Sequence, residues 1–453
     1  MSRADYADWP FWPEMRSDAD QARWWEECHV EAAAERQLQS TYHWFLLAGG
    51  PGSGKSVARH NWQRRQAADA LVLPYPPDRW PGASRAWFPD NPSHLAQMMA
   101  AAGLAVAERL QQEPALLDAL DEFQHEFLRA LLQFMGGERH YRRFVAALPR
   151  HYSEALLAVP VATDFFGDGH SWQGVHSQIE ELSQLLRGLG LRRALYVIDP
   201  PTPLGPEHAA GLADLFGWLD LTDNPGFAVA AVARAELLAA GSLLARARGR
   251  AGLVYTNWTA AACHRVAEQH LRVALTDAPA APLAALLTDN ALADLDALVN
   301  DEYGRPAPAA WAALAEALLY VTRRTAEPLP APLSRDDLPR LKVEYFRRHV
   351  PLGIDSQRGG VWRGPRFIPL NPQPLRFLQL LQQRRGHLVN WDDDDLRLLA
   401  GSKNNVHSIA SRTRHAIEPV AGYDVYLCNR TGDDGGYWLE NCTAAAADRA
   451  VTG

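Results

Sequence analysis

The sequence predicts an α/β fold in which a parallel sheet carries a helical insertion and a helical lid and is followed by an α+β domain. Three observations favour this fold. Between residues 40 and 257, short apolar runs alternate with helical patterns, which is typical of a parallel sheet covered on both faces. Helical periodicity alone occupies residues 93–158 and 258–325. Residues 359–442 change to short strands, compact helices and a glycine-rich hairpin.

Composition and charge restrict the class of protein. A chain of 453 residues predicts two or three domains. The net charge of −8 argues against a protein coated in nucleic acid, although it allows a local basic face. The four cysteines have no CxxC spacing, so we expect no zinc site, no disulfide framework and a reducing compartment. No signal peptide and no run of about 18 apolar residues is found, which predicts a cytoplasmic protein without a membrane segment.

The N-terminal part, residues 1–39, is expected to be an irregular arm followed by one helix that starts near residue 18. Trp9, Trp12, Trp24 and Trp25 crowd this region. We expect their rings to pack the arm on the sheet domain. A patch that docks a partner is the alternative.

The sheet domain is expected to span residues 40–257, with a helical insertion over about 93–158. The apolar runs predict strands at residues 42–50, 70–76, 194–199, 226–233 and 252–257. Helical patterns lie between them at residues 56–70, 207–220 and 237–248, and within the insertion at 93–110, 114–135 and 140–157. The helices of residues 258–325 would form a lid.

A glycine-rich loop between the first strand and the first helix matches the GxxxxGK[ST] motif of P-loop proteins. Its residues are Gly49, Gly50, Pro51, Gly52, Ser53, Gly54, Lys55 and Ser56, and Val57 continues into the helix. The glycines let backbone N–H groups point at phosphate oxygens, and the helix start adds its positive dipole end. Lys55 would reach the β and γ phosphates, and Ser56 would ligate Mg²⁺. The loop therefore predicts ATP and Mg²⁺ as ligands.

Asp199 ends the strand of residues 194–199 and is the expected second contact to Mg²⁺, through its water shell. Lys55 and Asp199 are thus the expected catalytic residues. Many ATPases of this kind carry a glutamate after the aspartate to polarise water, but position 200 is proline. We therefore expect slow hydrolysis at most, which suits a switch better than a motor.

Two arginines are candidates for contact with the nucleotide. Arg234 directly follows the strand predicted at residues 226–233, and its side chain could contact the γ-phosphate and so respond to its presence. Arg305 precedes a lid helix. For each of them, a solvated surface arginine is the alternative.

Residues of about 40–320 resemble the AAA+/STAND branch of P-loop ATPases, through the glycine-rich loop, the Asp199 strand, the strand after it and the helical lid. The resemblance implies that ATP lies between the core and the lid, with Arg305 as the lid arginine. Proline at position 200 departs from the pattern and affects turnover rather than binding.

The C-terminal part is expected to hold a linker over residues 326–358, a domain over 359–442 and a frayed tail over 443–453. The domain order is strand 361–370, helix 372–386, strand 387–390, helix 392–401, helix 402–419 and a hairpin at 423–441. With the segments LNPQPLRFLQLLQQRRGHLVN, HSIASRTRHAIEP and GGYWL, this order resembles the winged helix of OmpR/PhoB-class response regulators. The two resemblances together imply a P-loop parallel sheet with insertion and lid, followed by an α+β winged-helix domain, and the second implies that this domain binds double-stranded DNA.

The helix at 403–417 has an apolar stripe at Val406, Ile409, Ala410, Thr413 and Ile417. The candidate DNA-contacting residues are Lys403, Asn404, His407, Ser408, Ser411, Arg412, Arg414 and His415, with Arg430 in the hairpin. They are donors and no acid is among them, which suits bases and phosphates. An ordinary solvated helix is the alternative. Asp392–Asp395 and the nearly equal numbers of acidic and basic residues in the domain limit the attraction to phosphate, so we expect avidity from homo-oligomers formed on ATP binding.

The sequence thus favours an ATP-binding, slowly hydrolysing switch that regulates DNA binding, in transcription or defence signalling. The alternative is a STAND-type protein-interaction switch whose winged helix docks a protein partner. An enzyme acting on nucleic acid ranks third, since no nuclease-like carboxylate cluster or translocase motif is present.

Overall fold

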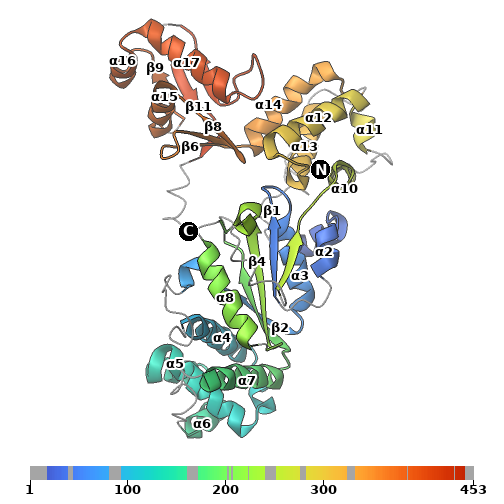
Figure 1. The fold of residues 1–453 in the computed structure, drawn as a ribbon, viewed down its shortest axis with the longest axis vertical. Coiled ribbons are helices and arrows are strands. Elements are labelled where there is room, and N and C mark those ends of the chain that lie inside the picture. Colours follow the sequence, from blue (N-terminus) through green and yellow to red (C-terminus); the bar gives the residue numbers. More distant parts are fainter. Residues whose placement is uncertain are drawn as a thin grey trace. The chain divides into compact units, whose positions relative to one another are not determined.

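A five-stranded parallel sheet is built from strands that lie between residues 44 and 255 (Figure 1). Its strands are β1 (Trp44–Gly49), β2 (Ala70–Pro74), β3 (Arg193–Ile198), β4 (Phe227–Arg234) and β5 (Ala251–Tyr255). Their spatial order is β2-β3-β4-β1-β5, and all four pairs are parallel. The predicted parallel sheet is therefore confirmed.

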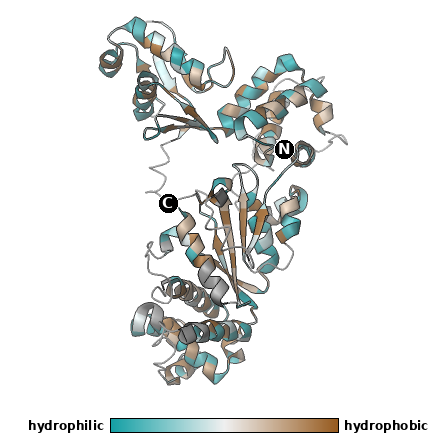
Figure 2. Cartoon of the chain, viewed as in Figure 1, coloured by the Kyte–Doolittle hydropathy of each residue, from teal (hydrophilic) through white to brown (hydrophobic). Residues whose placement is uncertain are grey.

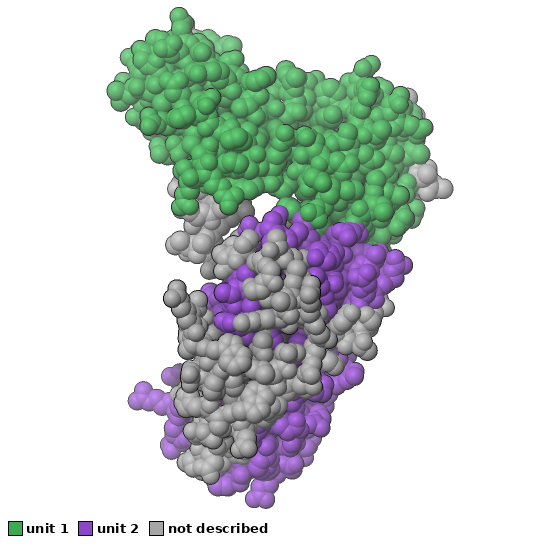
Figure 3. All heavy atoms as spheres, viewed as in Figure 1, with its two compact units in different colours: residues 1–30, 51–53, 258–453 green, residues 31–50, 54–257 purple. Residues whose placement is uncertain are grey.

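The computed structural model describes residues 18–38, 44–80, 93–160, 172–200, 204–205, 208–222, 224–239, 251–275, 282–323, 332–384, 386–432 and 434–443. The chain divides into two units, drawn in different colours in Figure 3. Unit 1 comprises residues 1–30, 51–53 and 258–453, and unit 2 comprises residues 31–50 and 54–257. Trp9, Trp12, residues 240–248 of one predicted helix and most of the predicted tail lie outside the described residues.

In unit 2 the two faces of the sheet are covered by different helices. Alternate residues of a strand point to opposite faces. Trp44 and Leu46 of β1 share a core with Leu212 of α8 (Ala209–Thr222). Phe45 points the other way, where its ring meets Trp62 of α3 (Lys55–Gln66) edge-on at 4.6 Å between centroids. The strands are apolar along their length (Figure 2), as burial on both faces requires.

The insertion is a helical bundle beside β2 and β3. It consists of α4 (Ser93–Gln112), the 3₁₀ turn η2 (Pro114–Ala119), α5 (Glu122–Ala146), α6 (Arg150–Ala158) and α7 (Trp172–Gly188). One predicted helix, residues 114–135, is divided because Asp121 caps α5: its side chain accepts from the N–H of Gln124, whose side chain accepts from the N–H of Asp121. The helix α7 was not predicted from the sequence.

At the start of the bundle, Tyr75 hydrogen-bonds His94 at 2.7 Å, and burial lowers the pKa of His94 to about 4.

The single helix predicted near the N-terminus is two helices, α1 (Asp18–Glu27) and α2 (Ala33–Leu38). Glu35 explains the restart, because its side chain accepts the N–H of Ala32 at 3.1 Å and thereby caps α2. In unit 1, Trp25 is buried and the Trp24 ring lies against His270.

The predicted lid helices are α10 (Ala260–Ala274), α11 (Pro282–Leu286), α12 (Asp289–Tyr303) and α13 (Pro308–Arg323) in unit 1. They are followed by η5 (Arg335–Asp337) and α14 (Leu338–His349), which packs on α13. Leu341 and Phe346 of α14 are buried in the same core as the lid. Within the segment expected to be a linker, residues 338–349 are therefore a packed helix.

The C-terminal domain combines two small sheets with three helices. The strands β6 (Leu352–Asp355), β7 (Gly360–Arg363) and β8 (Arg366–Pro369) are antiparallel, and β12 (Cys442–Thr443) joins β6. The helices are α15 (Pro372–Gln383), α16 (Asp394–Ala400) and α17 (Lys403–Ile417). The hairpin of β10 (Leu427–Arg430) and β11 (Gly436–Leu439) pairs with β9 (Val389–Asn390). The strand predicted over 361–370 is a hairpin, since Gly364 turns with a φ of 55°.

One hydrophobic core runs through unit 1, joining lid residues such as Trp311 to Phe377 and Ile409 of the C-terminal domain. The helices of residues 260–349 and the C-terminal domain thus share a buried core and are not connected by a linker alone.

Cys28, Cys263, Cys428 and Cys442 are free thiols. Among the described residues, no helix has the length and apolar character needed to cross a membrane.

Candidate nucleotide site and C-terminal helix

The loop between β1 and α3 has the backbone shape of a phosphate-binding loop. β1 ends at Gly49 and α3 begins at Lys55. Gly52 and Gly54 have φ values of 67° and 76°, in the left-handed region that glycine enters without strain. Turns of this kind direct successive N–H groups to one side and so form a concave surface for an anion.

Lys55 folds back onto this loop. Its ammonium group donates to the carbonyl oxygen of Gly50 at 2.7 Å, and the residue is only 7% exposed. A cation held against curled backbone is placed to bind the β and γ phosphate oxygens of a nucleotide. Val57, in the first turn of α3, is exposed.

Asp199 directly follows β3 and reaches the start of α3. β1 and β3 both pair with β4, so their carboxyl ends meet at one edge of the sheet. There, Ser56 Oγ donates to Asp199 Oδ1 at 3.2 Å. Hydroxyl and carboxylate oxygens are ligands that Mg²⁺ accepts, usually completed by water and substrate phosphates. No cluster of three or more His, Cys, Asp or Glu side chains that could hold a metal occurs among the described residues. The pair therefore fits a Mg²⁺ ion that arrives with a triphosphate.

Arg59 is a residue of this site that the sequence interpretation missed. Its Nε and Nη2 atoms donate to Asp199 Oδ2 at 3.0 and 2.7 Å, and its Nη1 donates to Gln63. Burial, and then the charges of Arg59 and Arg64, lower the pKa of the neighbouring His60. Ser56, Arg59 and Gln63 are three and four residues apart and share one face of α3. That spacing was the available signal.

Arg234 lies at the same edge of the sheet. It is the last residue of β4, and Gly49 is its register partner on β1. Its backbone N–H donates to the carbonyl of Leu204 at 2.9 Å. The strand end therefore brings the backbone of Arg234 beside the first glycine of the loop.

Within unit 1, the turn that carries Arg305 lies against the middle of the loop. Ala309 N–H donates to the carbonyl of Gly52 at 3.2 Å, and a Cβ atom on Gly52 would approach Tyr303 Cε1 to 2.9 Å. Trp258 Nε1 donates to the carbonyl of Ser53 at 2.9 Å. Arg305 is half-buried, two residues beyond Tyr303. Loop and lid turn are thus in direct contact.

A buried ion pair joins the same lid helix to the C-terminal domain. Glu302, the neighbour of Tyr303, accepts from Nε of Arg363 on β7 at 3.2 Å and from its Nη2. Arg363 and Glu302 side chains are 8% and 3% exposed. Arg363 Nη1 also donates to the carbonyl of Ile417 at 3.1 Å. Ile417 ends α17, so Arg363 satisfies one of the carbonyls that a helix end leaves unpaired.

α17 presents a polar face with no acid. The structure buries Val406, Ile409, Ala410, Thr413 and Ile417, and so confirms the predicted apolar stripe. The exposed predicted DNA-contacting residues of this helix are Lys403, Asn404, Ser408, Ser411, Arg412 and His415. Arg412 Nη2 donates to Gln373 on α15 at 3.1 Å, and the Lys403 ammonium lies 4.2 Å from the Trp391 ring centroid. This face is available to an anionic ligand.

Two predicted DNA-contacting residues have partners within the domain. His407 Nδ1 hydrogen-bonds Tyr437 at 2.6 Å, and its ring lies edge-on to Trp391. Arg414 donates to Asp424, Asn429 and the carbonyl of Leu427. Both side chains therefore hold α17 against the hairpin. Sequence spacing placed them on the polar face because it could not show the hairpin that covers that edge.

Arg430 is exposed at the end of β10, where it pairs with Gly436 across the hairpin.

The negative charge of the acidic residues Asp392–Asp395 is partly neutralised by arginines. Arg384 contacts Asp395 at 3.0 Å, and Arg397 contacts Asp392 at 2.9 Å. The cap of α16 is Asp393, which accepts the N–H of Asp395. Asn390 accepts the N–H of Asp392.

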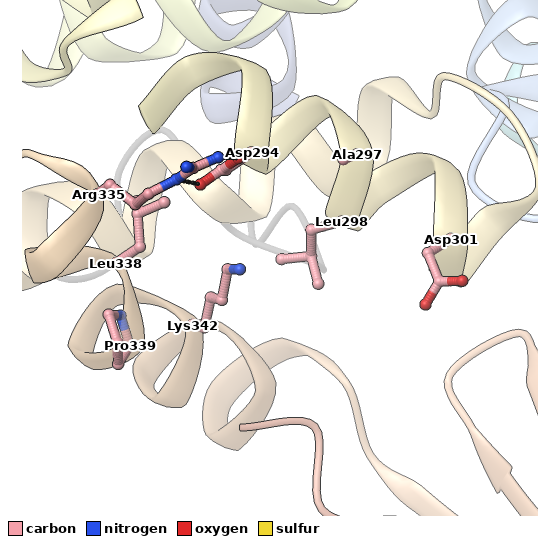
Figure 4. A pocket seen from close by; sticks show the side chains of 8 residues that line it. All are labelled: Asp294, Ala297, Leu298, Asp301, Arg335, Leu338, Pro339 and Lys342. Carbon is pink, nitrogen blue, oxygen red and sulfur yellow. Dashed lines mark hydrogen bonds and ion pairs between the residues drawn. The ribbon is translucent and has the colours of Figure 1, made fainter. Parts of the chain in front are cut away.

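An open groove of about 460 Å³ lies between α12 and α14 (Figure 4). Arg335 and Asp294 form an ion pair at one end, and Lys342 extends from α14 toward α12. Asp301, which pairs with Arg366, stands at the other end. The groove carries neither a phosphate-binding loop nor a metal-ligating cluster among its described residues.

Comparison with known proteins adds little to this geometry. No family model matches the sequence, and no curated protein matches it. A search of solved structures matches the chain to the crystal structure of Cdc6p from Pyrobaculum aerophilum, at 11% sequence identity and a TM-score of 0.35, over 99% of this chain and 96% of that chain.

Proposed function

We propose that the protein is an ATP-binding, slowly hydrolysing switch of the AAA+/STAND type that regulates DNA binding by a C-terminal winged-helix domain. The contact of Gly52 with Tyr303, beside the Glu302–Arg363 pair that reaches the end of α17, carries this proposal. It gives a physical link from a phosphate-binding loop to the helix that would read DNA.

In the proposed site, the backbone N–H groups of Gly50 and of residues 52–56, together with the Lys55 ammonium, bind the phosphates of ATP. Ser56 and Asp199, which are hydrogen-bonded to each other, would hold the Mg²⁺ ion that accompanies the nucleotide. Arg234 and Arg305 add positive charge near the γ-phosphate. When bound, Mg²⁺ neutralises phosphate charge. Pro200 has no proton-accepting side chain, so no base follows Asp199 and turnover is slow.

The proposed reader is α17, with the β10–β11 hairpin as the wing. Support comes from the order of elements, a sheet, three helices and a hairpin, and from the exposed donors on α17. Lys403, Arg412 and Arg430 would contact phosphates, and Asn404 or Ser408 would reach base edges in the major groove. His407 and Arg414 would act indirectly, by fixing the helix on its domain.

The proposed coupling runs through α12. Nucleotide phosphates alter the loop that contacts Tyr303, whose pKa is raised by burial and whose hydroxyl lies 3.5 Å from Tyr345. A movement of this turn would displace Glu302, and the hydrogen bonds of Arg363 to Glu302 and to the carbonyl of Ile417 would transmit that displacement to α17. Such a chain of contacts couples the two sites only if it has two conformations that bind nucleotide with different affinities. Assembly of several copies on ATP would add avidity on DNA. The cellular role we propose is transcriptional or defence regulation in the cytoplasm.

A second candidate function is docking of a protein partner by the same domain. Leu398 on α16 is 85% exposed, next to the acidic residues 392–395. An exposed leucine with an acidic surround favours a protein rather than DNA at this helix. A measurement of DNA binding distinguishes the two functions, because only the first requires the domain to bind DNA.

The test is fluorescence anisotropy of a random DNA duplex titrated with the full chain at two salt concentrations. We expect salt-sensitive binding, and we expect Arg412→Ala to weaken it by roughly 1 kcal/mol and to reduce the salt slope by about one ion. Affinity for ATP should stay unchanged. Arg358→Ala is the matched control, since Arg358 is an exposed arginine of the same domain in the β6–β7 turn. Binding that is absent, or equal in wild type and Arg412→Ala, would favour the docking function.

A further inference from the structure

Asp199 is held at both of its carboxylate oxygens. Ser56 donates to Oδ1 at 3.2 Å, while Arg59 donates twice to Oδ2, at 3.0 and 2.7 Å. The side chains of Arg59 and Asp199 are 15% and 9% exposed. Two guanidinium donors thus converge on one carboxylate oxygen, and such charge-assisted hydrogen bonds out of bulk water are stronger than those between neutral groups.

The position of Arg59 is fixed by its own helix. Gln63, one turn further along α3, accepts a third hydrogen bond from the guanidinium through its side-chain oxygen. α3 itself begins at Lys55, so the backbone of Arg59 lies one helical turn from the loop. The positive charge is therefore a built-in part of this site.

The charge balance at the strand end is unusual for a Mg²⁺ site. Asp199 would supply the negative charge that attracts the cation, and Arg59 already neutralises it. The next position is proline, so the strand end offers one carboxylate rather than two. A divalent ion near Ser56 would meet the guanidinium as a like charge, and repulsion over several ångströms weakens its binding on the order of tenfold.

We propose that Arg59 sets the cation requirement of the nucleotide site: it competes with Mg²⁺ for Asp199, so that ATP binds with a weak dependence on Mg²⁺. This inference rests on the proposed function. It predicts that the retention of nucleotide is governed mainly by the loop and Lys55. Removing the charge of Arg59 should strengthen the contribution of the cation.

The test is the affinity of the full chain for a fluorescent ATP analogue across free Mg²⁺ concentrations, from EDTA to saturation. For wild type we expect affinity to rise less than about tenfold. Arg59→Gln keeps a donor for Asp199 Oδ2 without charge, and should enlarge that rise by on the order of tenfold. Arg59→Lys keeps the charge and should stay near wild type. In Arg59→Gln with Asp199→Asn, the added Mg²⁺ dependence should disappear.

Three outcomes would overturn the inference. The first is an unchanged Mg²⁺ dependence in Arg59→Gln. The second is a reduced dependence in both Arg59→Gln and Arg59→Lys, which would make Arg59 a residue that only orients Asp199. The third is a wild-type chain that binds no analogue at any Mg²⁺ concentration, which would remove the proposed function as well. Thermal unfolding of each variant verifies that it is folded.

Discussion

Replacing Lys55 by alanine is expected to abolish the stabilisation that Mg-ATP gives to the chain. A ligand that binds only the folded state at about 100 times its dissociation constant adds about 2.7 kcal/mol to the free energy of unfolding. Lys55 is the cation of the loop and folds onto the carbonyl of Gly50. Without it, the phosphates lose their main positive partner, and the shift in melting temperature with Mg-ATP should fall to near zero.

The matched control is Lys342→Ala. Lys342 is also a helix lysine, and it extends into the groove between α12 and α14. This variant should keep the full shift with Mg-ATP. The readout is the difference between melting temperatures with and without ligand, so a change in basal stability does not affect it. An equal shift in wild type and Lys55→Ala would contradict the role assigned to the loop.

Removing Arg363 is expected to have the largest effect on stability. Arg363→Met leaves the Glu302 carboxylate buried, with Arg366 as a partner at 3.2 Å, and unpairs the carbonyl of Ile417. Breaking one side of a buried ion pair typically costs about 3–5 kcal/mol, and the remaining contact to Arg366 sets our expectation near 3 kcal/mol. Urea unfolding followed by circular dichroism measures it.

The double variant Glu302→Met with Arg363→Met separates stability from coupling. Replacing both partners of a buried pair by apolar side chains is often neutral or stabilising. We therefore expect unfolding free energy close to wild type. The influence of nucleotide on DNA affinity should nevertheless be lost, because the contact from the Tyr303 turn to α17 is gone. A double variant with intact coupling would show that the pair serves stability alone.

The parts of the molecule that could be predicted from sequence are those whose signal is local. The loop at 49–56 is a contiguous motif, and its strand and helix neighbours follow from periodicity. The buried stripe of α17 follows from helical spacing in the same way. The position of Asp199 could be predicted because an apolar run that follows the phosphate-binding loop in the sequence ends in this acidic residue.

The parts that could not be predicted depend on partners far apart in the chain. Arg59 and Asp199 are 140 positions apart, and Glu302 and Arg363 are 61 apart. Periodicity describes one element at a time, so an arginine on a helix looks solvated until its partner is known. The packed helix α14 was missed for another reason: the Pro-rich stretch before it favoured a linker, although its buried Leu341 and Phe346 lie in the lid core.

The most direct test of the account is thermodynamic linkage between the two sites. DNA affinity should be measured with and without saturating Mg-ATP, and ATP affinity with and without saturating DNA. If the loop controls α17, the two affinities change by the same factor, which we expect to be about fivefold or more. DNA affinity that is identical with and without nucleotide, in a chain that binds both, would contradict the account.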